Sequence, residues 1–328
     1  MPADRPDKPT VDEFDVIARL MRPLTLGAPE ALDLLDDAAV LTPRPDEDLV
    51  ISADMMVEGV HFLAGDPIDQ VAQRLLRTNL SDLAAKAAQP YAYFLSIAWP
   101  PRCGWAERQA FAQGLERDQR AYGLKLLGGD SVSTPGPLTA SVTILGRTPP
   151  GRAVLRSGAR AGDVVLVSGW IGDGWLGLQA ALEGRTAPSL TRYRTPEPRV
   201  ALTPALRAWA TAAADVSDGL IADAGHIAAA SALGVELDLD AVPLSAEGRA
   251  FADHPSERQD RLLRLAAGGD DYEVVLTSAP ENVAAMIEAA RAAGVAMTPI
   301  GRMVEGRAVR VLFQRREIRV NRAGYRHG

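Results

Sequence analysis

The chain has 328 residues, of which 47% are hydrophobic and 23% charged, a balance typical of a globular protein long enough for two domains. Its net charge of −7 argues against a nucleic-acid-binding surface, because phosphate backbones require a basic patch. The single cysteine, Cys103, excludes an intramolecular disulfide and fits a reducing compartment, and no uncharged apolar run reaches the roughly 20 residues of a membrane span. We therefore expect a cytoplasmic protein that binds neither nucleic acid nor membrane.

The first half of the chain is predicted to be a mixed α/β domain. Residues 1–12 are charged and proline-rich and are predicted to be disordered. A short amphipathic helix is expected next, with Phe14, Ile17, Ala18 and Met21 on one face. The elements expected after it are strands over 48–56, 93–99, 123–129 and 138–146, and helices over 68–88 and 105–122.

The second half is separated from the first by a stretch without apolar periodicity. Residues 148–162 are rich in glycine, proline and arginine, which indicates a domain junction that divides 1–148 from 149–328. The elements expected beyond it are a strand over 163–169, a loop over 185–204, two helices within 205–233, strands over 234–239 and 271–277, a helix over 281–293 and two closing strands. Their irregular order predicts two α/β domains with mixed rather than purely parallel sheets.

One glycine-rich segment matches a nucleotide-binding pattern. GDGWLG, residues 172–177, has the G-x-G-x-x-G spacing, follows a predicted strand and opens a predicted helix. The segment after that helix, however, has no second strand ending in an acid that could hold a ribose. We therefore interpret these glycines as a tight strand-to-helix turn. Phosphate-binding-loop, protein-kinase and zinc-ligand patterns do not occur in the sequence.

Acids beside small residues recur along the chain. They stand in LLDDAAV, ISADMM, NLSDLAA, GGDSV, DVSDG and GGDDYE. Each alone fits a turn or a helix cap, but Asp82 falls inside an apolar helix, and Asp54 and Asp130 close predicted hydrophobic strands, so these acids are expected inside the protein or at a cleft.

Few basic residues stand beside these acids in the sequence. DVSDGLIADAGH, residues 215–226, contains three acids and neither lysine nor arginine. An unpaired buried carboxylate is unfavourable by several kcal/mol, and hard divalent cations with oxygen ligands are the usual compensation. Because Mg²⁺ takes one or two carboxylates per ion together with water and phosphate oxygens, so many acids predict several Mg²⁺ ions on a polyphosphate.

These motifs, in this order, resemble the thiamine-monophosphate kinase family, which shares a superfamily with aminoimidazole ribonucleotide synthetase. The similarity runs from FDVIARL through ISADMMVEGVHF, NLSDLAAKAAQP, LLGGDSV, DVSDGLIADAGHI and GGDDYEV to the terminal GYRHG. It implies a two-domain α/β fold of the aminoimidazole-ribonucleotide-synthetase type, whose N-terminal domains pair into a homodimer. The implied reaction is Mg²⁺-dependent, in-line transfer of the γ-phosphoryl group of ATP to thiamine monophosphate, giving thiamine diphosphate and ADP.

The resemblance also implies roles for individual residues, carried over by position. The implied Mg²⁺ ligands are Asp37, Ser52, Ala53 (through its backbone carbonyl), Asp54, Asp82, Asp130, Asp215 and Asp218. The implied ATP contacts are Gly129, Asp130, Arg156 and Ser217, and the implied thiamine-phosphate contacts are His61, Asp270 and Tyr325. The implied catalytic residues are Asp54, Asp82 and Arg156.

Two positions depart from the family pattern. Leu35 stands where a glycine is usual and Asp270 where a glutamate is usual, which concerns substrate geometry rather than the metal cluster. Both are in addition to Ala53, which stands where the family often has threonine. One alternative is another ATP-dependent enzyme of the superfamily, such as an aminoimidazole-ribonucleotide-synthetase-like protein, which ISADMMVEGVHF and GGDDYE fit poorly. The other is a non-catalytic nucleotide-binding regulator, which the two departures alone support.

Overall fold

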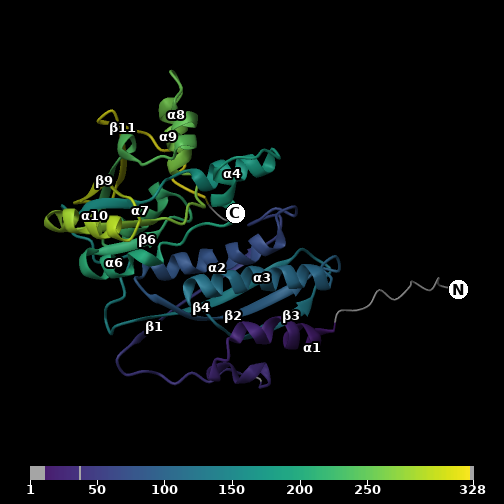
Figure 1. The fold of residues 1–328 in the computed structure, drawn as a ribbon. Helices are drawn as coiled ribbons and strands as arrows, with labels where there is room; N and C mark the ends of the chain where they lie inside the picture. Colours follow the sequence, from purple (N-terminus) through teal and green to yellow (C-terminus); the bar gives the residue numbers. More distant parts are fainter. Residues whose placement is uncertain (1–11, 37, 326–328) are drawn as a thin grey trace. The chain divides into compact units, whose positions relative to one another are not determined.

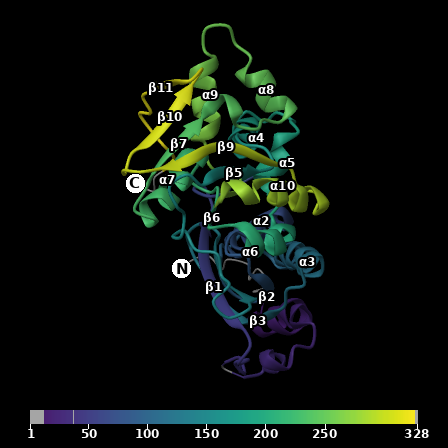
Figure 2. The same ribbon diagram turned by 90° about the vertical axis from the view of Figure 1, so that its left-hand side faces the viewer.

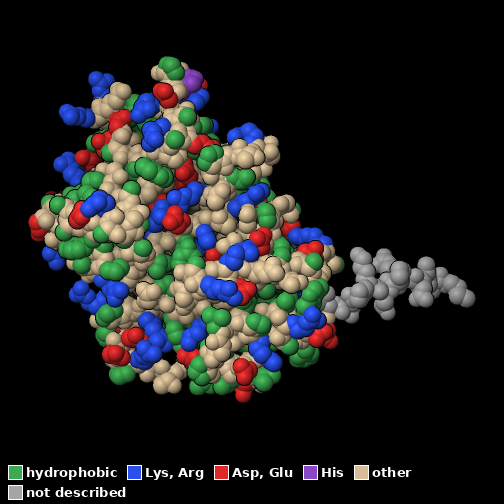
Figure 3. Space-filling model, viewed as in Figure 1, with side chains coloured by type: hydrophobic (Ala, Val, Ile, Leu, Met, Phe, Trp, Pro, Cys, Tyr) green, Lys and Arg blue, Asp and Glu red, His purple; other side chains and the backbone are tan. Residues whose placement is uncertain are grey.

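The computed structural model describes residues 12–36 and 38–325 (Figure 1). The predicted disorder of the first residues therefore lies almost wholly outside the described part, as does Asp37. The chain forms two compact units: the first comprises 1–43, 53–76 and 91–144, and the second comprises 44–52, 77–90 and 145–328. Among the described helices, none is both long enough and apolar enough to span a membrane. On the face shown in Figure 3, Lys and Arg side chains are interspersed with Asp and Glu.

A four-stranded sheet, most of which falls in the first unit, has the order β1-β4-β2-β3. Its strands are β1 (Asp48–Val57), β2 (Gln89–Trp99), β3 (Leu126–Ser133) and β4 (Thr139–Thr148). Helices α2 (Ile68–Ala85) and α3 (Trp105–Tyr122) lie over one face of this sheet (Figures 1 and 2). Leu75, Leu76, Leu80 and Leu83 of α2 are completely buried, as their helical spacing predicts. The helix ends before the predicted residue 88 because Ala87 adopts a left-handed conformation, with φ of 54°.

The predicted N-terminal helix is instead three short helical turns. They are α1 (Glu13–Val16), a π turn (Ile17–Met21) and a 3-10 turn (Arg22–Thr25). The change of pitch breaks the 3.6-residue period, so that Val16 is buried whereas Phe14 is 79% exposed. The prediction that Phe14 belongs to the buried face is therefore wrong.

The second unit contains a seven-stranded sheet of order β11-β10-β7-β9-β5-β8-β6. Its strands are β5 (Val164–Ser168), β6 (Ala212–Asp215), β7 (Gly234–Asp238), β8 (Val274–Ser278), β9 (Met297–Val304), β10 (Val309–Phe313) and β11 (Arg316–Ile318). β10 and β7 are parallel and the other pairs antiparallel, so the sheet is mixed as predicted. β6 falls in the range 205–233, for which two helices and no strand are predicted, but its AAAD segment pairs with β8 and is buried, which outweighs the helix preference of alanine.

Helices cover both faces of this sheet (Figure 2). Val165 and Val167 of β5 pack into the same apolar cluster as residues of α4, α7 and α9, whereas Leu166 packs with residues of α6 and α10. This alternation is that of a strand buried on both sides. The helices of the unit are α4 (Asp173–Leu182), α5 (Ser189–Arg194), α6 (Thr203–Trp209), α7 (Leu220–Ala230), α8 (Ala246–Ala252), α9 (Arg258–Ala266) and α10 (Val283–Ala292).

Candidate active site

Asp82 and Ser52 place two side-chain oxygens, each able to ligate a metal ion, next to each other in the second unit. Asp82 lies on α2, and its Oδ2 accepts a hydrogen bond of 2.5 Å from the Ser52 hydroxyl on β1. Burial raises the pKa of the Asp82 carboxyl, whereas the Ser52 hydrogen bond and the positive charges of Lys86 and Arg156 act in the opposite direction. The carboxylate is therefore held in an environment that favours a nearby cation.

The positive charges of Lys86 and Arg156 act on the predicted acids, although neither residue is near the segment 215–226 in the sequence. The Lys86 ammonium donates to the Ala213 carbonyl at 2.8 Å and is attracted by Asp82 and Asp215. Burial, with the repulsion of Arg156, lowers the pKa of Lys86 to about 8. The expectation that the acids of residues 215–226 lack a basic partner is thus wrong for Asp215. Lys86 stands four residues after Asp82, and this helical spacing was a sequence signal for the pairing.

The loop after β6 lies against two other segments that carry predicted site residues. The backbone N–H of Asp270 donates to the Ser217 carbonyl at 2.9 Å, and the N–H of Tyr325 donates to the Asp218 carbonyl at 2.8 Å. Asp215 is the last residue of β6 and is buried. Five residues predicted from separate motifs therefore meet around one loop.

Asp223 holds that loop at the N-terminus of α7. Its Oδ2 accepts from the N–H groups of Asp218 and Gly219, each at 3.1 Å, while its buried Oδ1 has no hydrogen-bond partner among the described residues. Asp218, Asp223 and His226 each offer a ligand atom, and these atoms lie within 4.8 Å of one another. Neither Asp223 nor His226 was predicted as a site residue, although their i, i+3 spacing on a helix is a recognisable signal.

Burial, followed by the charge of Asp218, raises the pKa of Asp223 from its ordinary 3.8 to about 7. Between these two values the folded chain keeps a proton that the unfolded chain has lost, so this group makes stability fall as pH rises from about 4 to 7. Asp223→Asn keeps an acceptor and cannot ionise. With EDTA present, we expect the variant to gain thermal stability relative to the parent as pH rises from 5 to 8, as measured by Tm. Parallel Tm curves would contradict this, and Asp260→Asn on α9 is the control.

In the first unit, Gly129 and Asp130 of β3 line a cavity of about 730 Å³. Its wall includes the apolar side chains of Ile17, Met21 and Leu34, beside backbone and polar groups of β2 and β3. A Cβ at position 129 would lie 1.7 Å from the carbonyl oxygen of Leu95, so the close approach of β2 requires glycine. The cavity thus combines an apolar wall with an acid and a closely packed backbone.

Asp54 and Asp130 do not end their strands, contrary to prediction. β1 continues to Val57 and β3 to Ser133, so both acids are exposed positions within strands. The Asp54 carbonyl accepts from the Ser141 hydroxyl at 3.1 Å. Ala53, between Ser52 and Asp54, is also exposed.

His61 follows β1 and has a defined tautomer. Its Nδ1 accepts from the backbone N–H of Val57 at 3.0 Å, so the proton of the neutral ring is on Nε2. The carbonyl of His61 accepts from Arg74 Nε at 3.2 Å. The first contact orients the imidazole, and the second holds the backbone of His61.

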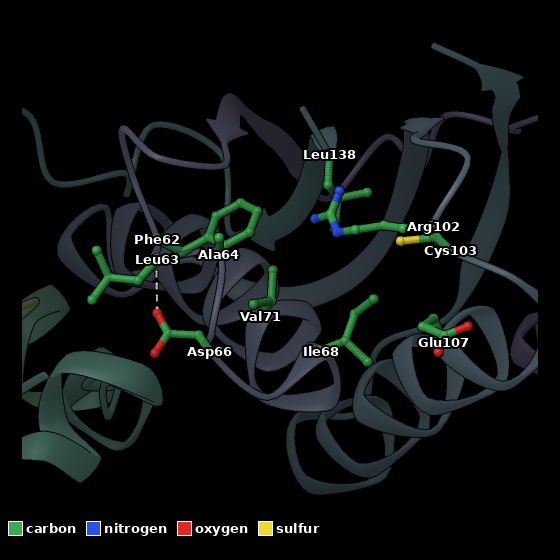
Figure 4. Close-up of a pocket in the computed structure, with 10 residues that line it drawn as sticks. All are labelled: Phe62, Leu63, Ala64, Asp66, Ile68, Val71, Arg102, Cys103, Glu107 and Leu138. Carbon is green, nitrogen blue, oxygen red and sulfur yellow. Dashed lines mark hydrogen bonds between the residues drawn. The ribbon is translucent and has the colours of Figure 1, made fainter. Parts of the chain in front are cut away.

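A second cavity of the first unit, about 280 Å³, contains none of the predicted site residues that the structure describes (Figure 4). Phe62, Val71 and Leu138 are among its apolar lining, with Arg102 and Cys103 at one side. Burial raises the pKa of the Cys103 thiol, which makes it a poor nucleophile at neutral pH.

Residues 35–148 match the N-terminal domain of the AIR synthase related protein family, and residues 160–314 match its C-terminal domain. A thiamine-monophosphate kinase from Caulobacter vibrioides is 53% identical over 319 residues, which covers 96% of this chain and 91% of that protein. The chain belongs to the thiamine-monophosphate kinase family.

Solved structures agree with this assignment. A thiamine-monophosphate kinase from Stenotrophomonas maltophilia superposes with a TM-score of 0.81 at 37% identity, covering 92% of this chain and 96% of that one. A protein described as AaThiL, complexed with AMPPCP and TMP, superposes with a TM-score of 0.76 at 27% identity, covering 87% and 89%. The thiamine-monophosphate kinase resemblance and the two-domain α/β fold expected from the motifs are confirmed.

Proposed function

We propose that this chain transfers the γ-phosphoryl group of ATP to thiamine monophosphate, giving thiamine diphosphate and ADP. Its place in the thiamine-monophosphate kinase family confirms the kinase predicted from the motifs, and the AaThiL complex holds AMPPCP, an ATP analogue, together with TMP. Within this chain, the observation that carries the proposal is the Ser52–Asp82 pair, with Lys86 and Arg156 acting on it. Acids and bases gathered in this way suit phosphoryl transfer between two anions.

The cavity beside Gly129 and Asp130 is the proposed site for part of ATP. Its volume of about 730 Å³ lies within the ordinary range for small-molecule pockets. The apolar side chains of Ile17 and Met21 suit an aromatic base. Arg156 and Ser217 are the proposed ATP contacts of the second unit.

The donor set of the site fits Mg²⁺, which prefers oxygen ligands. In the second unit, Ser52 and Asp82 already share a hydrogen bond, and Asp215 and Asp218 add carboxylates on either side of one loop. The proposed ligands of several Mg²⁺ ions are Asp37, Ser52, the carbonyl of Ala53, Asp54, Asp82, Asp130, Asp215 and Asp218. Bound Mg²⁺ would neutralise charge on the phosphate oxygens.

The acceptor needs no general base, because the phosphate of thiamine monophosphate is an anion at neutral pH. The remaining barrier is electrostatic. The Arg156 guanidinium can donate two parallel hydrogen bonds to the transferring group. Lys86, whose pKa is about 8, is largely protonated at pH 7 and holds a fixed positive charge near Asp82 and Asp215. Direct in-line transfer without a phospho-enzyme follows from these roles.

The proposed contacts to thiamine monophosphate are His61, Asp270 and Tyr325. Asp270 Oδ1 accepts a hydrogen bond of 3.0 Å from the Tyr272 hydroxyl, which directs this carboxylate. Asp270 is one methylene shorter than the glutamate usual in the family, so we expect a slightly shifted substrate or a bridging water.

One assay tests the function and separates the alternatives. The purified chain is incubated with ATP, Mg²⁺ and thiamine monophosphate, and thiamine diphosphate is measured by chromatography. We expect ATP-dependent product that is lost with EDTA. Binding of an ATP analogue without product would favour a non-catalytic regulator, whereas ATP consumption with an aminoimidazole ribonucleotide precursor would favour the alternative enzyme.

We also propose a homodimer. The exposed side chains of Leu49, Ile51 and Met55 alternate along one face of the edge strand β1, where Ile51 is 60% exposed. An apolar stripe of this kind marks an interaction surface, and the mass in solution, measured by light scattering, tests its use. We further propose a cytoplasmic location and a domain boundary between residues 148 and 149. The positions of the two family matches, 35–148 and 160–314, support that boundary.

A further inference from the structure

The loop before β8 has an unfavourable backbone conformation. Asp270 and Tyr272 have φ angles of 65° and 51°, in the left-handed region that residues with a Cβ rarely adopt. Such residues are strained, so the surrounding structure must hold them in this conformation. Because of this conformation, β8 begins at Val274 rather than at the predicted Asp271. The strained loop includes Asp270, the proposed substrate contact.

Asp271, between the two strained residues, accepts hydrogen bonds from the backbone of a distant segment. Its Oδ1 accepts from the N–H of Gly172 at 3.0 Å and from the N–H of Gly174 at 2.9 Å, and its Oδ2 accepts again from Gly172 at 2.9 Å. These N–H groups belong to the first turn of α4, where the helix dipole also favours a carboxylate. Asp271 is thus tied to the GDGWLG turn.

The geometry points to Asp271 as a positioning residue, which locks the loop at 270–272 onto the N-terminus of α4 and so presents Asp270 to thiamine monophosphate. The inference rests on the proposed function for its substrate, but the locking itself does not. It also assigns a role to the G-x-G-x-x-G segment: the N–H groups that such a turn offers to a phosphate are here occupied by the chain's own carboxylate.

The turn and the loop are in direct contact beyond these hydrogen bonds. A Cβ at position 174 would lie 2.2 Å from the carbonyl oxygen of Asp270, so glycine is required for the two backbones to approach. On its other side the loop is held by the Ser217 carbonyl, which accepts from Asp270, and by the Val216 carbonyl, which accepts from Tyr272 at 2.8 Å. The loop is therefore clamped between α4 and the loop that carries Ser217 and Asp218.

The residue after the loop is anchored separately. Glu273 is buried, forms a two-fold ion pair with Arg199 at 2.5 and 2.6 Å, and accepts from the Ser168 hydroxyl at 2.6 Å. This ion pair holds the start of β8 whether or not Asp271 is present. A change at Asp271 is therefore expected to release the loop without unfolding the sheet.

Three variants test the lock. Asp271→Ala removes every acceptor, Asp271→Asn keeps one oxygen that can accept from both glycines, and Gly174→Ala displaces Asp270 without changing Asp271. We expect KM for thiamine monophosphate to rise about tenfold or more in Asp271→Ala and Gly174→Ala, and less in Asp271→Asn, with kcat and KM for ATP nearly unchanged. Hydrogen exchange at the amides of Asp270 and Tyr272 should accelerate in the same order.

Asp173→Asn is the matched control. Asp173 lies in the same turn, but its Oδ1 accepts from the Ser245 hydroxyl at 2.6 Å instead of from the loop. Unchanged exchange at Asp270 and Tyr272 in Asp271→Ala and Asp271→Asn, both folded by Tm, would overturn the inference. The inference would also be overturned if these two amides exchanged at the same rate in Asp271→Ala and in the control Asp173→Asn. Faster exchange without a change in KM would support the lock and refute the proposed contact between Asp270 and thiamine monophosphate, which Asp270→Ala tests independently.

Discussion

Asp82→Asn is expected to lower kcat by about a thousandfold or more, equivalent to about 4 kcal/mol in the barrier. Asparagine can still accept from the Ser52 hydroxyl, so the local packing stays, but the negative charge proposed to hold Mg²⁺ is lost. Because burial already disfavours the ionised carboxyl, Tm without metal should not fall. Steady-state kinetics and thermal unfolding, each with and without Mg²⁺ and AMPPCP, measure both effects.

Binding should change together with turnover in that variant. Mg²⁺ with AMPPCP should raise Tm of the parent chain by several degrees, and Asp82→Asn should lose most of this rise. Asp69→Asn, at the exposed start of the same helix, should behave like the parent chain. Near-normal kcat in Asp82→Asn would refute its role as a metal ligand.

Arg156→Lys is expected to lower kcat about a hundredfold while ATP affinity changes much less. Lysine keeps the positive charge near Asp82 but cannot donate two parallel hydrogen bonds to the transferring group. Single-turnover kinetics separates the chemical step from binding, and titration with AMPPCP measures affinity.

Arg152→Lys provides the control for this change. Arg152 lies four residues earlier, is exposed, and donates to the Arg207 carbonyl at 2.9 Å. It should leave kcat unaltered. If Arg156→Lys also left kcat unaltered, a role on the transferring phosphate would be excluded.

The sequence by itself determined the family and the class of fold. The order of the acidic motifs indicated a thiamine-monophosphate kinase, and short runs of apolar, mostly β-branched residues predicted strands such as DVVLVSG, since such a run is typical of a strand buried on both faces. The helical spacing of Leu75, Leu76, Leu80 and Leu83 placed Asp82 on a helix correctly. These features depend on residues that are close together in the chain, so the sequence alone is enough to predict them.

Only the tertiary structure decided which groups meet the acids. Lys86 contacts the carbonyl of Ala213 because β6, expected to be helical, joins the sheet beside β8. A strand rich in alanine is selected by its pairing and burial, which outweigh local propensity.

The same holds for the glycine-rich turn. Its sequence suggested a tight turn but not the partner of its N–H groups, and Asp271 reaches it from almost a hundred residues away in the chain. Hydrogen-bond partners and close backbone approaches between distant segments depend on topology, and no local pattern encodes them. That is the physical reason why motif and period suggested candidate site residues along the chain, while the packing of the loops decided which groups they contact.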